Sequence, residues 1–458
     1  MINSTFIKNK HLLSRASFGI QFHQINDLDK KSTKQFLSEL IAEKEFKPIN
    51  IVSNDLEIDY ATFSKLDSNA KKIKSKKNRE QNILLNLKFF DEMLNSEDQL
   101  REKMAFFWNG HFATRIINPQ FNQDLLNTIR ENALGNFGDL LKAVSKSPAM
   151  LQFLNNQQNK KGHPNENFGR EVMELFTMGR GNYTEKDVKE GSRAFTGWGY
   201  GKDGTFQERP RFHDSESKTF LGKTGNFNGD DILDIILTQK ITAKFITKKI
   251  YRFFVNENID EKIAEDLSEN FYASNYDIKK LMTEIFTSDW FYEEKNIGAK
   301  IKSPIELMTG ILRILPTKIY NPKNLIVYQK LLGQMLLYPP NVAGWPFGKS
   351  WIDSSTLLLR MQLPQIWSGL RPLDLKPKAD DDLQMGMSTD LIKKKKNGNE
   401  NFTIDWPKIE ILFKDKNISE ILLQKSLNGD GKYINQFSDG SIKMNIINIM
   451  SVPEYQLM

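Results

Sequence analysis

The chain has 458 residues and a formal net charge of +7, and its 64 basic residues are interspersed with 57 acidic ones. This balance argues against a general nucleic-acid-binding surface, which needs basic residues clustered on one face. Hydrophobic residues make up 39% of the chain and include 31 Phe, so the chain can bury a large core and is not disordered. It contains no cysteine, which excludes disulfides, thiolate nucleophiles and zinc ribbons.

The sequence shows no segment that would cross or enter a membrane. No apolar run reaches the roughly 18–20 residues that a transmembrane helix needs. The N-terminal stretch MINSTFIKNKHLLSRASFGI lacks the apolar core of a signal peptide. We therefore expect no membrane span and a cytoplasmic location by default, with a periplasmic or exported location left open.

Helical patterns dominate the chain from its N-terminal part onward. Ser32–Ala42 opens with a hydroxyl cap and spaces its apolar residues at helical intervals. We interpret the basic run Lys71–Lys77 as a solvated loop. It leads into a strongly apolar helix over Gln81–Leu94.

Two four-residue patterns match capping boxes, which mark the first turn of a helix. Ser96 and Gln99 predict the start of a helix that runs to Phe112, and Thr184 and Asp187 predict the start of another. Further helices are expected over residues 124–134, 138–145, 165–178, 186–198, 232–255, 261–272, 278–288, 304–315, 325–337 and 418–427.

Strand patterns are few, and the best is a short hairpin around Gly199–Gly222, where Gly and aromatic residues alternate with polar ones. The span Pro372–Phe402 is poor in aromatic residues and rich in charge, including the run Lys393–Lys396, so we interpret it as a loop. We predict an all-α fold, a single large helical domain with a minor β-hairpin. Its parts are a helical domain over 1–371, a flexible charged loop over 372–402, and a C-terminal helical segment over 403–458 that packs back on the main domain.

The segment that begins at Asn165, NENFGREVMELFT, combines an N-cap, an apolar face and a charged stripe. On a helical wheel Asn167, Arg170, Glu171 and Glu174 share this narrow stripe. Two interpretations are open. Arg170 and Glu174 can form an i, i+4 pair on a wet surface, worth about 0.2–0.5 kcal/mol. Alternatively, Glu171 and Glu174 point together as metal ligands or as an acid–base pair, held by Arg170 and Asn167.

Two of the five histidines are candidate metal ligands or proton shuttles. His111 lies on the apolar face of its helix, where a lone histidine is more often a hydrogen-bonded core residue. His213 is followed by Asp214 and, five positions after the histidine, by Lys218. Imidazoles and carboxylates together form a mixed set of ligands suited to Zn, Mn or Fe. The chain has no HExxH, no EF-hand, no phosphate-binding loop and no dinucleotide-binding fingerprint.

Motifs spread over most of the chain resemble a known family. They are His11-Leu12-Leu13 with Arg15, REKMAFFWNGHF, PNENFGREVMELFTMGRGNYTEKDVKEGSRAFTGW, HDSESKTFLG, and PPNVAGWPFGKSWID with Arg360. In this order they are similar to the bacterial "domain of unknown function 1800" family, from His11 to Leu363. The departures are slight, with Gly169 where the family commonly has Ala and Met178 where it has Leu.

The family has no established activity, but the resemblance implies which polar residues matter. Its motif residues correspond here to His11, Arg15, His111, Asn167, Arg170, Glu171, Glu174, His213, Asp214 and Lys218. Polar residues of this kind are costly to bury unless they are paired, so the resemblance favours an interior network or a pocket over a wet face. Members are often encoded beside sulfatase-like proteins, which implies a sulfatase-like partner, in an envelope or secretory context.

Our first functional hypothesis is a metal-assisted hydrolase or transferase with a polar pocket. Its catalytic residues, and the ligands of a divalent metal, would be Glu171, Glu174, His111 and His213. Its substrate-binding residues would be Arg15, Asn167, Arg170 and Lys218. The competing hypothesis is a non-catalytic scaffold or accessory partner of the sulfatase-like protein, in which the same residues form an internal ion-pair network.

One further motif, PPNVAGW, is interpreted as a rigid structural corner. Pro339 and Pro340 end a helix, Gly344 allows a turn, and Trp345 fills a gap in the core.

Overall fold

The computed structural model describes residues 4–52, 66–373, 402–425 and 440–458, and helices make up most of this part of the chain. The helices of the first half are α1 (Ser4–Ala16), α2 (Thr33–Ile41), α4 (Ser68–Asn95), α5 (Gln99–His111), α6 (Pro119–Asn132), α7 (Phe137–Lys146), α8 (Pro148–Phe153), α9 (Glu166–Glu171) and α10 (Glu185–Ala194). Those of the second half are α11 (Gly229–Leu237), α12 (Lys240–Phe254), α13 (Glu261–Ala273), α14 (Ile278–Thr287), α15 (Pro304–Ile314), α16 (Lys323–Leu331), α17 (Ser354–Trp367), α19 (Trp406–Phe413), α20 (Ile418–Leu422) and α22 (Ile442–Met450). The predicted all-α fold is confirmed.

The strands of the described residues form three small two-stranded antiparallel sheets. Two are hairpins, β1 (Trp198–Tyr200) with β2 (Phe206–Glu208) and β3 (Lys218–Phe220) with β4 (Lys223–Gly225). These two hairpins occupy the region where one hairpin is predicted. The third sheet pairs β5 (Thr317–Ile319) with β6 (Phe402–Ile404), a contact between distant segments that the sequence patterns do not predict.

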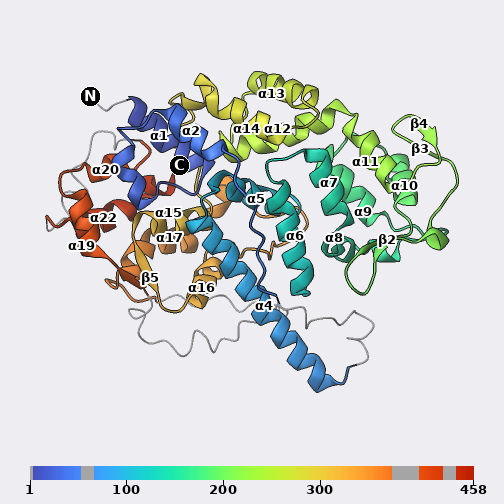
Figure 1. Cartoon of the computed structure of the whole chain (residues 1–458), viewed down its shortest axis with the longest axis horizontal. Coiled ribbons are helices and arrows are strands. Elements are labelled where there is room, and N and C mark those ends of the chain that lie inside the picture. Colours follow the sequence, from blue (N-terminus) through green and yellow to red (C-terminus); the bar gives the residue numbers. More distant parts are fainter. Residues whose placement is uncertain (1–3, 53–65, 374–401, 426–439) are drawn as a thin grey trace.

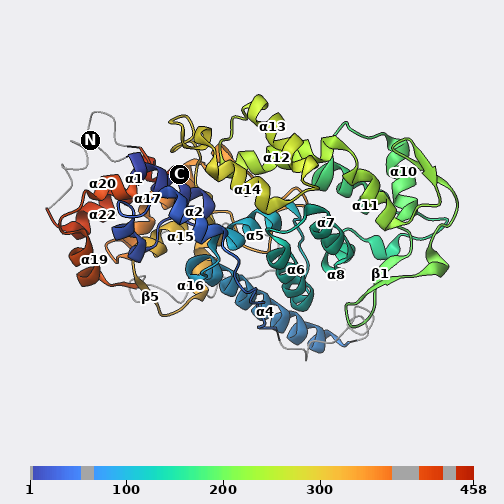
Figure 2. The ribbon, with the colours of Figure 1, turned by 45° about the horizontal axis from the view of Figure 1, so that its top comes forward.

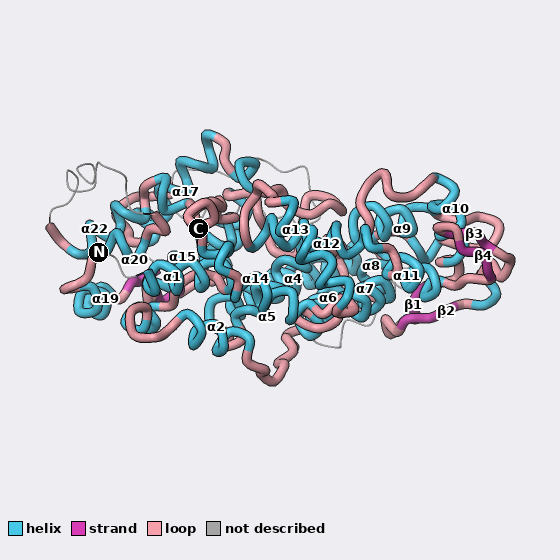
Figure 3. Tube along the Cα trace, turned by 90° about the horizontal axis from the view of Figure 1, so that it is seen from above, coloured by secondary structure: helices cyan, strands magenta, loops and turns pink. Residues whose placement is uncertain are grey.

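The molecule is elongated (Figures 1 and 2). One end holds α1, α2 and the C-terminal helices α19, α20 and α22, and the other holds α10 and the hairpins β1–β4. The centre holds α5, α12 and α14. Seen from above, helices run through the whole length, and most of the strands lie at the α10 end (Figure 3). Within α4 the buried residues run from Asn78 to Met93, and the N-terminal part of this helix extends away from the other ribbons (Figure 1).

Side-chain caps fix where several of these helices begin. The predicted box at the start of α10 is confirmed, because Thr184 and Asp187 each accept a hydrogen bond from the other's backbone N–H. The same reciprocal arrangement joins Ser32 and Gln35 in α2, and Ser303 and Glu306 in α15.

Other element predictions are wrong in their boundaries. The basic run Lys71–Lys77 is not a loop, because it lies within the helix α4. Ser96 closes α4 and does not cap α5; the N-cap of α5 is Asp98, whose carboxylate instead pairs with Arg101. The helix predicted over 232–255 is divided into α11 and α12, and the one over 325–337 ends at Leu331.

The described C-terminal residues pack back on the main body. Met458 exchanges two backbone hydrogen bonds with Lys300, at 2.8 and 3.2 Å. Arg360 of α17 donates from Nε to the side chain of Gln456 at 3.1 Å. Most of the predicted loop over 372–402, including Lys393–Lys396, lies outside the described residues. None of the helices in the described ranges combines the length and hydropathy needed to cross a bilayer.

Candidate functional site

A cavity of about 330 Å³ lies between α5, α12, the segment before α15 and the loop that carries the PPNVAGW motif. Its volume falls within the range of about 300–1,000 Å³ typical of small-molecule sites. Six aromatic side chains line it: Phe106, Phe107, Phe253, Trp345, Phe347 and Trp351. Six titratable side chains line it as well: His111, Lys249, Arg252, Glu257, Lys300 and Glu306. Arg252 and Phe347 are exposed, so the cavity reaches the protein surface.

Two glycines allow the PPNVAGW loop to form one wall of this cavity. Gly344 has a φ of 85°, and a Cβ at this position would stand 2.2 Å from the carbonyl oxygen of Gly110 in α5. The loop backbone therefore lies directly on the helix backbone, and only glycine fits. Gly348 has a φ of 57°, and a Cβ there would stand 2.0 Å from the carboxylate of Glu257. Trp345 lies between these two glycines in the chain. It is almost buried, and its side chain lines the cavity.

His111 lies in the wall of the cavity and is almost fully buried. Its Nε2 donates a hydrogen bond to the carbonyl oxygen of Phe176 at 3.0 Å, because a carbonyl can only accept. Burial, with the nearby positive charge of Lys249, holds the pKa of His111 well below its usual value, so the ring is neutral at pH 7. Its Nδ1 is then an acceptor, and it has no hydrogen-bond partner among the described residues. The ring thus lines the cavity and carries one buried acceptor without a partner among the described residues.

The residue that fixes His111 belongs to an unusual stretch of helix. After α9 the chain forms a π-helix over Val172–Thr177, and the N–H groups of Met178 and Gly179 both donate to the carbonyl of Met173. The last carbonyls of a helix lack partners within the helix. Here the Phe176 carbonyl accepts from His111, and the Leu175 carbonyl accepts from Lys249 at 3.4 Å. Short π-helical segments are frequent at functional sites, and this one meets the cavity residues through its backbone.

On another side of the cavity, Glu306 forms a buried ion cluster. Its Oε1 binds Lys103 Nζ at 2.6 Å and Lys300 Nζ at 2.9 Å, and its Oε2 accepts from the Ser303 backbone at 2.8 Å. The two lysine charges and their hydrogen bonds hold the pKa of Glu306 far below its usual value, against the effect of burial. Burial lowers the pKa of Lys300 to about 7, although Glu306 opposes the shift. Burial similarly lowers the pKa of Lys249 to about 8.

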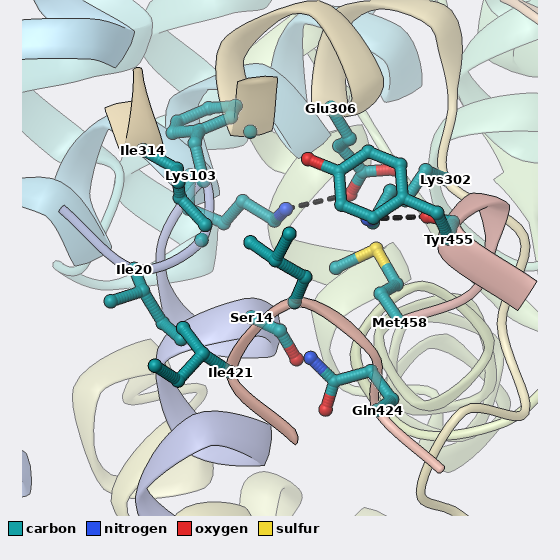
Figure 4. Close-up of a pocket in the computed structure, with 14 residues that line it drawn as sticks. Ser14, Ile20, Lys103, Lys302, Glu306, Ile314, Ile421, Gln424, Tyr455 and Met458 are labelled. Carbon is teal, nitrogen blue, oxygen red and sulfur yellow. Dashed lines mark hydrogen bonds and ion pairs between the residues drawn. The ribbon is translucent and has the colours of Figure 1, made fainter. Parts of the chain in front are cut away.

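Glu306 also borders a second, small cavity of about 40 Å³ (Figure 4). Lys103 and Lys302 line this small cavity, and Lys302 donates to the Tyr455 carbonyl at 2.6 Å. Figure 4 shows Lys103 and Glu306 pointing toward one another, joined by their ion pair. The Glu306 carboxylate thus lies between the two cavities, bound by Lys103 from the small one and by Lys300 from the large one.

The charged stripe from Asn167 to Glu174 lies elsewhere and is half exposed. The side chains of Arg170 and Glu174 are 32% and 24% exposed, so they do not form the predicted buried network. They do not form the predicted i, i+4 pair either, because the π-helix changes the direction of the side chains after Val172. Neither the two glutamates nor Arg170 and Asn167 line the large cavity.

The stripe residues have separate partners. Arg170 binds both carboxylate oxygens of Glu185 at 2.8 Å, and also Glu166 at 3.2 Å. Glu174 accepts a hydrogen bond from the Tyr183 hydroxyl at 2.6 Å. Burial raises the pKa of Glu171, and the neighbouring charge of Glu174 adds to this shift. Asn167 is exposed and donates to the carbonyl of Leu154.

The His213 segment is at the α10 end of the molecule, with α10 and β3 (Figure 1). His213 donates from Nδ1 to the Thr196 carbonyl at 2.9 Å. Asp214 accepts from Arg193 at 2.7 Å, and the buried Lys218 amine donates to the carbonyl of Glu216 at 3.0 Å. This segment therefore forms its own local hydrogen-bond network and does not line the large cavity.

The predicted metal centre is not formed by these residues. In the ranges that the structure describes, no group of three or more His, Asp or Glu side chains is arranged to hold a metal ion. The four proposed ligands are dispersed: His111 borders the cavity, Glu171 and Glu174 lie on the half-exposed stripe, and His213 binds Thr196. The expectation failed because a helical wheel places residues on one helix and says nothing about which other elements come close.

Arg15 is the predicted substrate-binding residue that lies nearest to this region. It is 1% exposed and donates from Nη2 to the Asn296 carbonyl at 2.8 Å, while its Nε and Nη1 have no partner among the described residues. Burial lowers its pKa to about 9, and the charges of Glu306 and Glu257 oppose this shift. Arg15 is thus close enough to both carboxylates to interact with them, from behind the cavity wall.

Sequence reasoning missed most of the residues that line the cavity. It selected His111, but not Lys249, Arg252, Glu257, Lys300 or Glu306. A usable signal was that WNGHF and PPNVAGW, two motifs of the resemblance, each combine glycine with aromatic residues. The contact of Gly344 with Gly110 joins these motifs in the structure.

Comparison with protein families gives a match that covers most of this chain. The model of a family described as "Protein of unknown function (DUF1800)" matches residues 11–443. Neither the curated proteins nor the solved structures compared with the chain give a match. The match covers nearly the whole chain, including both motifs that line the large cavity, and the chain therefore belongs to the DUF1800 family of proteins of unknown function.

Proposed function

We propose that the protein binds a small organic molecule in the large cavity and that His111 serves as a hydrogen-bond acceptor or general base for it. The observation that carries this proposal is the unused Nδ1 of a neutral, nearly buried histidine in the wall of an aromatic-lined cavity. A buried polar atom without a partner is costly unless a ligand or water satisfies it. Few convergent polar groups in an otherwise apolar cavity are typical of ligand sites.

Hydrolysis or group transfer remains the proposed class of reaction. A neutral imidazole with a free nitrogen can accept a proton from water or from a hydroxyl group of a substrate. In this proposal His111 takes the catalytic part, and Glu171, Glu174 and His213 take none, because they do not line the cavity. The proposal assigns no role to a metal.

The alternative function, a scaffold or accessory partner of a sulfatase-like protein, stays a prediction, and so does the compartment. No contact of the described residues bears on either. A ligand-binding cavity is compatible with both hypotheses, but only the enzyme hypothesis needs His111 to act on what is bound.

The proposal is tested by NMR on protein with ¹³C-labelled histidine, titrated with benzamide as a neutral aromatic probe. We expect the signal of the His111 ring to shift as benzamide binds, and the signal of His213 to stay unchanged. The His111→Gln variant assigns the signal, and His213 acts as the internal control because it does not line the cavity. Shifts confined to other histidines, or no shift at saturating probe, would refute the proposal.

Matched tryptophan variants give a second readout. Trp345→Ala removes a wall of the cavity, whereas Trp290→Ala removes a half-buried ring that stacks on Tyr251 and does not line the cavity. Benzamide binding should be lost in the first variant and retained in the second. Equal binding by the two variants would place the probe outside the cavity.

A further inference from the structure

We infer that the ligand of the large cavity is an organic anion whose charged group is bound by Lys249, Arg252 and Lys300. This inference rests on the proposed function and specifies the chemistry of its ligand. It follows from the balance of charge in the cavity wall and behind it.

The wall itself carries more positive than negative groups. Three basic side chains line the cavity, Lys249, Arg252 and Lys300, together with two carboxylates, Glu257 and Glu306. Glu306 is already occupied, because the same oxygen binds both Lys103 and Lys300. Its second oxygen accepts the Ser303 N–H, so little of its accepting capacity remains for a cationic ligand.

Behind the wall the excess of positive charge increases. Besides Lys103 and Lys300, Glu306 interacts electrostatically with Arg15, Lys302 and Arg360. The Nε and Nη1 of Arg15 and the Nη1 of Arg360 are buried donors without a partner among the described residues. Lys103 and Lys302 are visible with Glu306 around the small cavity in Figure 4. Buried positive charge that outnumbers its counter-charges is unfavourable, and an anion in the neighbouring cavity would offset it.

The remaining wall suits an apolar or aromatic body attached to this charged group. Trp345 and Phe347 come from the PPNVAGW loop and Trp351 from the 3-10 helix Gly348–Trp351 that follows it, and Phe106, Phe107 and Phe253 come from α5 and α12. Rings of this kind stack on flat ligands and bury apolar surface. A carboxylate and a phosphate monoester share the required chemistry, and the probes below distinguish them.

Binding of an anion should be coupled to protonation of Lys300. The groups that face this amine are Glu306, Lys103 and Arg15, and the cavity adds Lys249, Arg252, Glu257 and the neutral His111. Burial lowers the pKa of Lys300 to about 7, so the amine is partly deprotonated at neutral pH. A bound anion favours the charged form and raises this pKa. Binding therefore takes up a proton near pH 7–8, and the affinity falls as the pH rises through this range.

The test is isothermal titration calorimetry of the full chain with benzoate, phenyl phosphate and benzamide. Benzamide matches benzoate in shape and lacks its charge. We expect at least one of the two anions to bind about tenfold or more tightly than benzamide at pH 7, since hydrogen bonds to charged groups are the stronger ones. Which anion binds more tightly identifies the charged group as carboxylate or phosphate. Benzamide binding as tightly as both anions would overturn the inference alone, and no binding by any probe would overturn the proposed function together with it.

Neighbouring lysines of α12 supply matched variants. Lys249 lines the cavity, whereas Lys248 does not and forms an ion pair with Glu261 at 2.7 Å. Lys249→Met should weaken binding of the preferred anion about tenfold or more and leave benzamide binding unchanged. Lys248→Met should change neither. Arg252→Gln provides a second variant, which should fold normally because Arg252 is exposed. If neither Lys249→Met nor Arg252→Gln weakens anion binding relative to Lys248→Met, the inference is wrong.

Discussion

Replacing Glu306 by Gln removes a carboxylate that binds two buried amines at once. Lys103 is fully buried and Lys300 is 5% exposed, and both reach the same oxygen of Glu306, at 2.6 and 2.9 Å. The amide of Gln keeps nearly the same shape, so the change removes charge without opening a cavity. The change also turns one of the two accepting oxygens into an NH2 donor, which faces either the lysine amines or the Ser303 N–H and adds to the cost.

The expected cost is large because the charges are buried. Removing one partner of a buried ion pair costs about 3–5 kcal/mol, since the other charge is left without compensation. Here two amines lose their common counter-charge, with Arg15 nearby as a further positive group. The amines limit the loss by giving up their protons. We therefore expect a decrease in the free energy of unfolding of about 3–5 kcal/mol near pH 6.

The decrease should depend on pH. Burial already lowers the pKa of Lys300 to about 7 and lowers that of Lys103, and in both cases Glu306 opposes the shift. In Glu306→Gln both pKa values fall further, so the folded variant releases these protons at a lower pH than the wild type. An amine with a lowered pKa makes stability rise with pH between its folded and unfolded pKa values, by about 1.4 kcal/mol per pH unit. This rise begins at a lower pH in the variant than in the wild type. The difference in free energy of unfolding between the two therefore narrows as the pH increases toward and beyond 7.

Urea unfolding followed by circular dichroism, at about pH 5.5, 7 and 8.5, measures this deficit. Glu261→Gln is the matched control, because its pair with Lys248 lies at the surface, where an ion pair contributes little to stability. A deficit for Glu306→Gln no larger than that of the control would refute the reasoning. A deficit that does not narrow between pH 5.5 and 8.5 would refute the assignment of the lysine protonation states.

Two further predictions concern the loop of the cavity and the charged stripe. Gly348→Ala and Gly333→Ala should each lower the free energy of unfolding by about 1–2 kcal/mol, because both glycines have positive φ. A Cβ at Gly333 meets nothing within 4 Å, whereas a Cβ at Gly348 displaces the Glu257 carboxylate. Only Gly348→Ala should therefore also change the affinity for benzoate, measured by calorimetry. Equal benzoate affinities of the two variants would contradict this. Glu174→Gln should cost no more than about 1 kcal/mol in urea unfolding, because this side chain is partly exposed and an amide oxygen still accepts the Tyr183 hydrogen bond. It should also lower the pKa of Tyr183, which burial raises and Glu174 raises further, and an unchanged spectrophotometric titration of this tyrosine would contradict the contact.

Much of the helical fold follows from local signals in the sequence. Helix starts at Ser32 and Thr184 depend on a cap and a residue three positions later, which can be read directly. The boundary at Ser96 shows the limit of such signals. The same residue fits the end of one helix and the start of the next, and only the short connection between α4 and α5 decides between them.

The π-helix and the third sheet could not be predicted in this way. A π-helix differs from an α-helix in its hydrogen bonds, such as the one from Met178 N–H to the Met173 carbonyl, and these leave no residue pattern. The pairing of β5 with β6 joins segments that are distant in the chain, and each strand has only three residues. Short strands of this kind carry too little alternation to be recognised.

The candidate site was predictable only in part, because it is built from residues with long-range partners. His111 was selected as a scarce residue on an apolar face. Lys300 and Glu306 were not, because lysine and glutamate are mostly exposed, and only the ion pairs of Glu306 with Lys103 and Lys300 permit their burial. Lys103 and Glu306 lie 203 positions apart, and no local pattern indicates that they meet.

The central claim, that the cavity between α5, α12 and the PPNVAGW loop is the ligand site, is tested most directly by a crystal structure with phenyl phosphate bound. The claim predicts that the ring of phenyl phosphate lies against Trp345. It also predicts that the phosphate oxygens lie within hydrogen-bond distance of Lys249, Arg252 or Lys300. Phenyl phosphate bound elsewhere, for example on the Arg170 stripe or beside Lys218, with the cavity free of it, would contradict the claim.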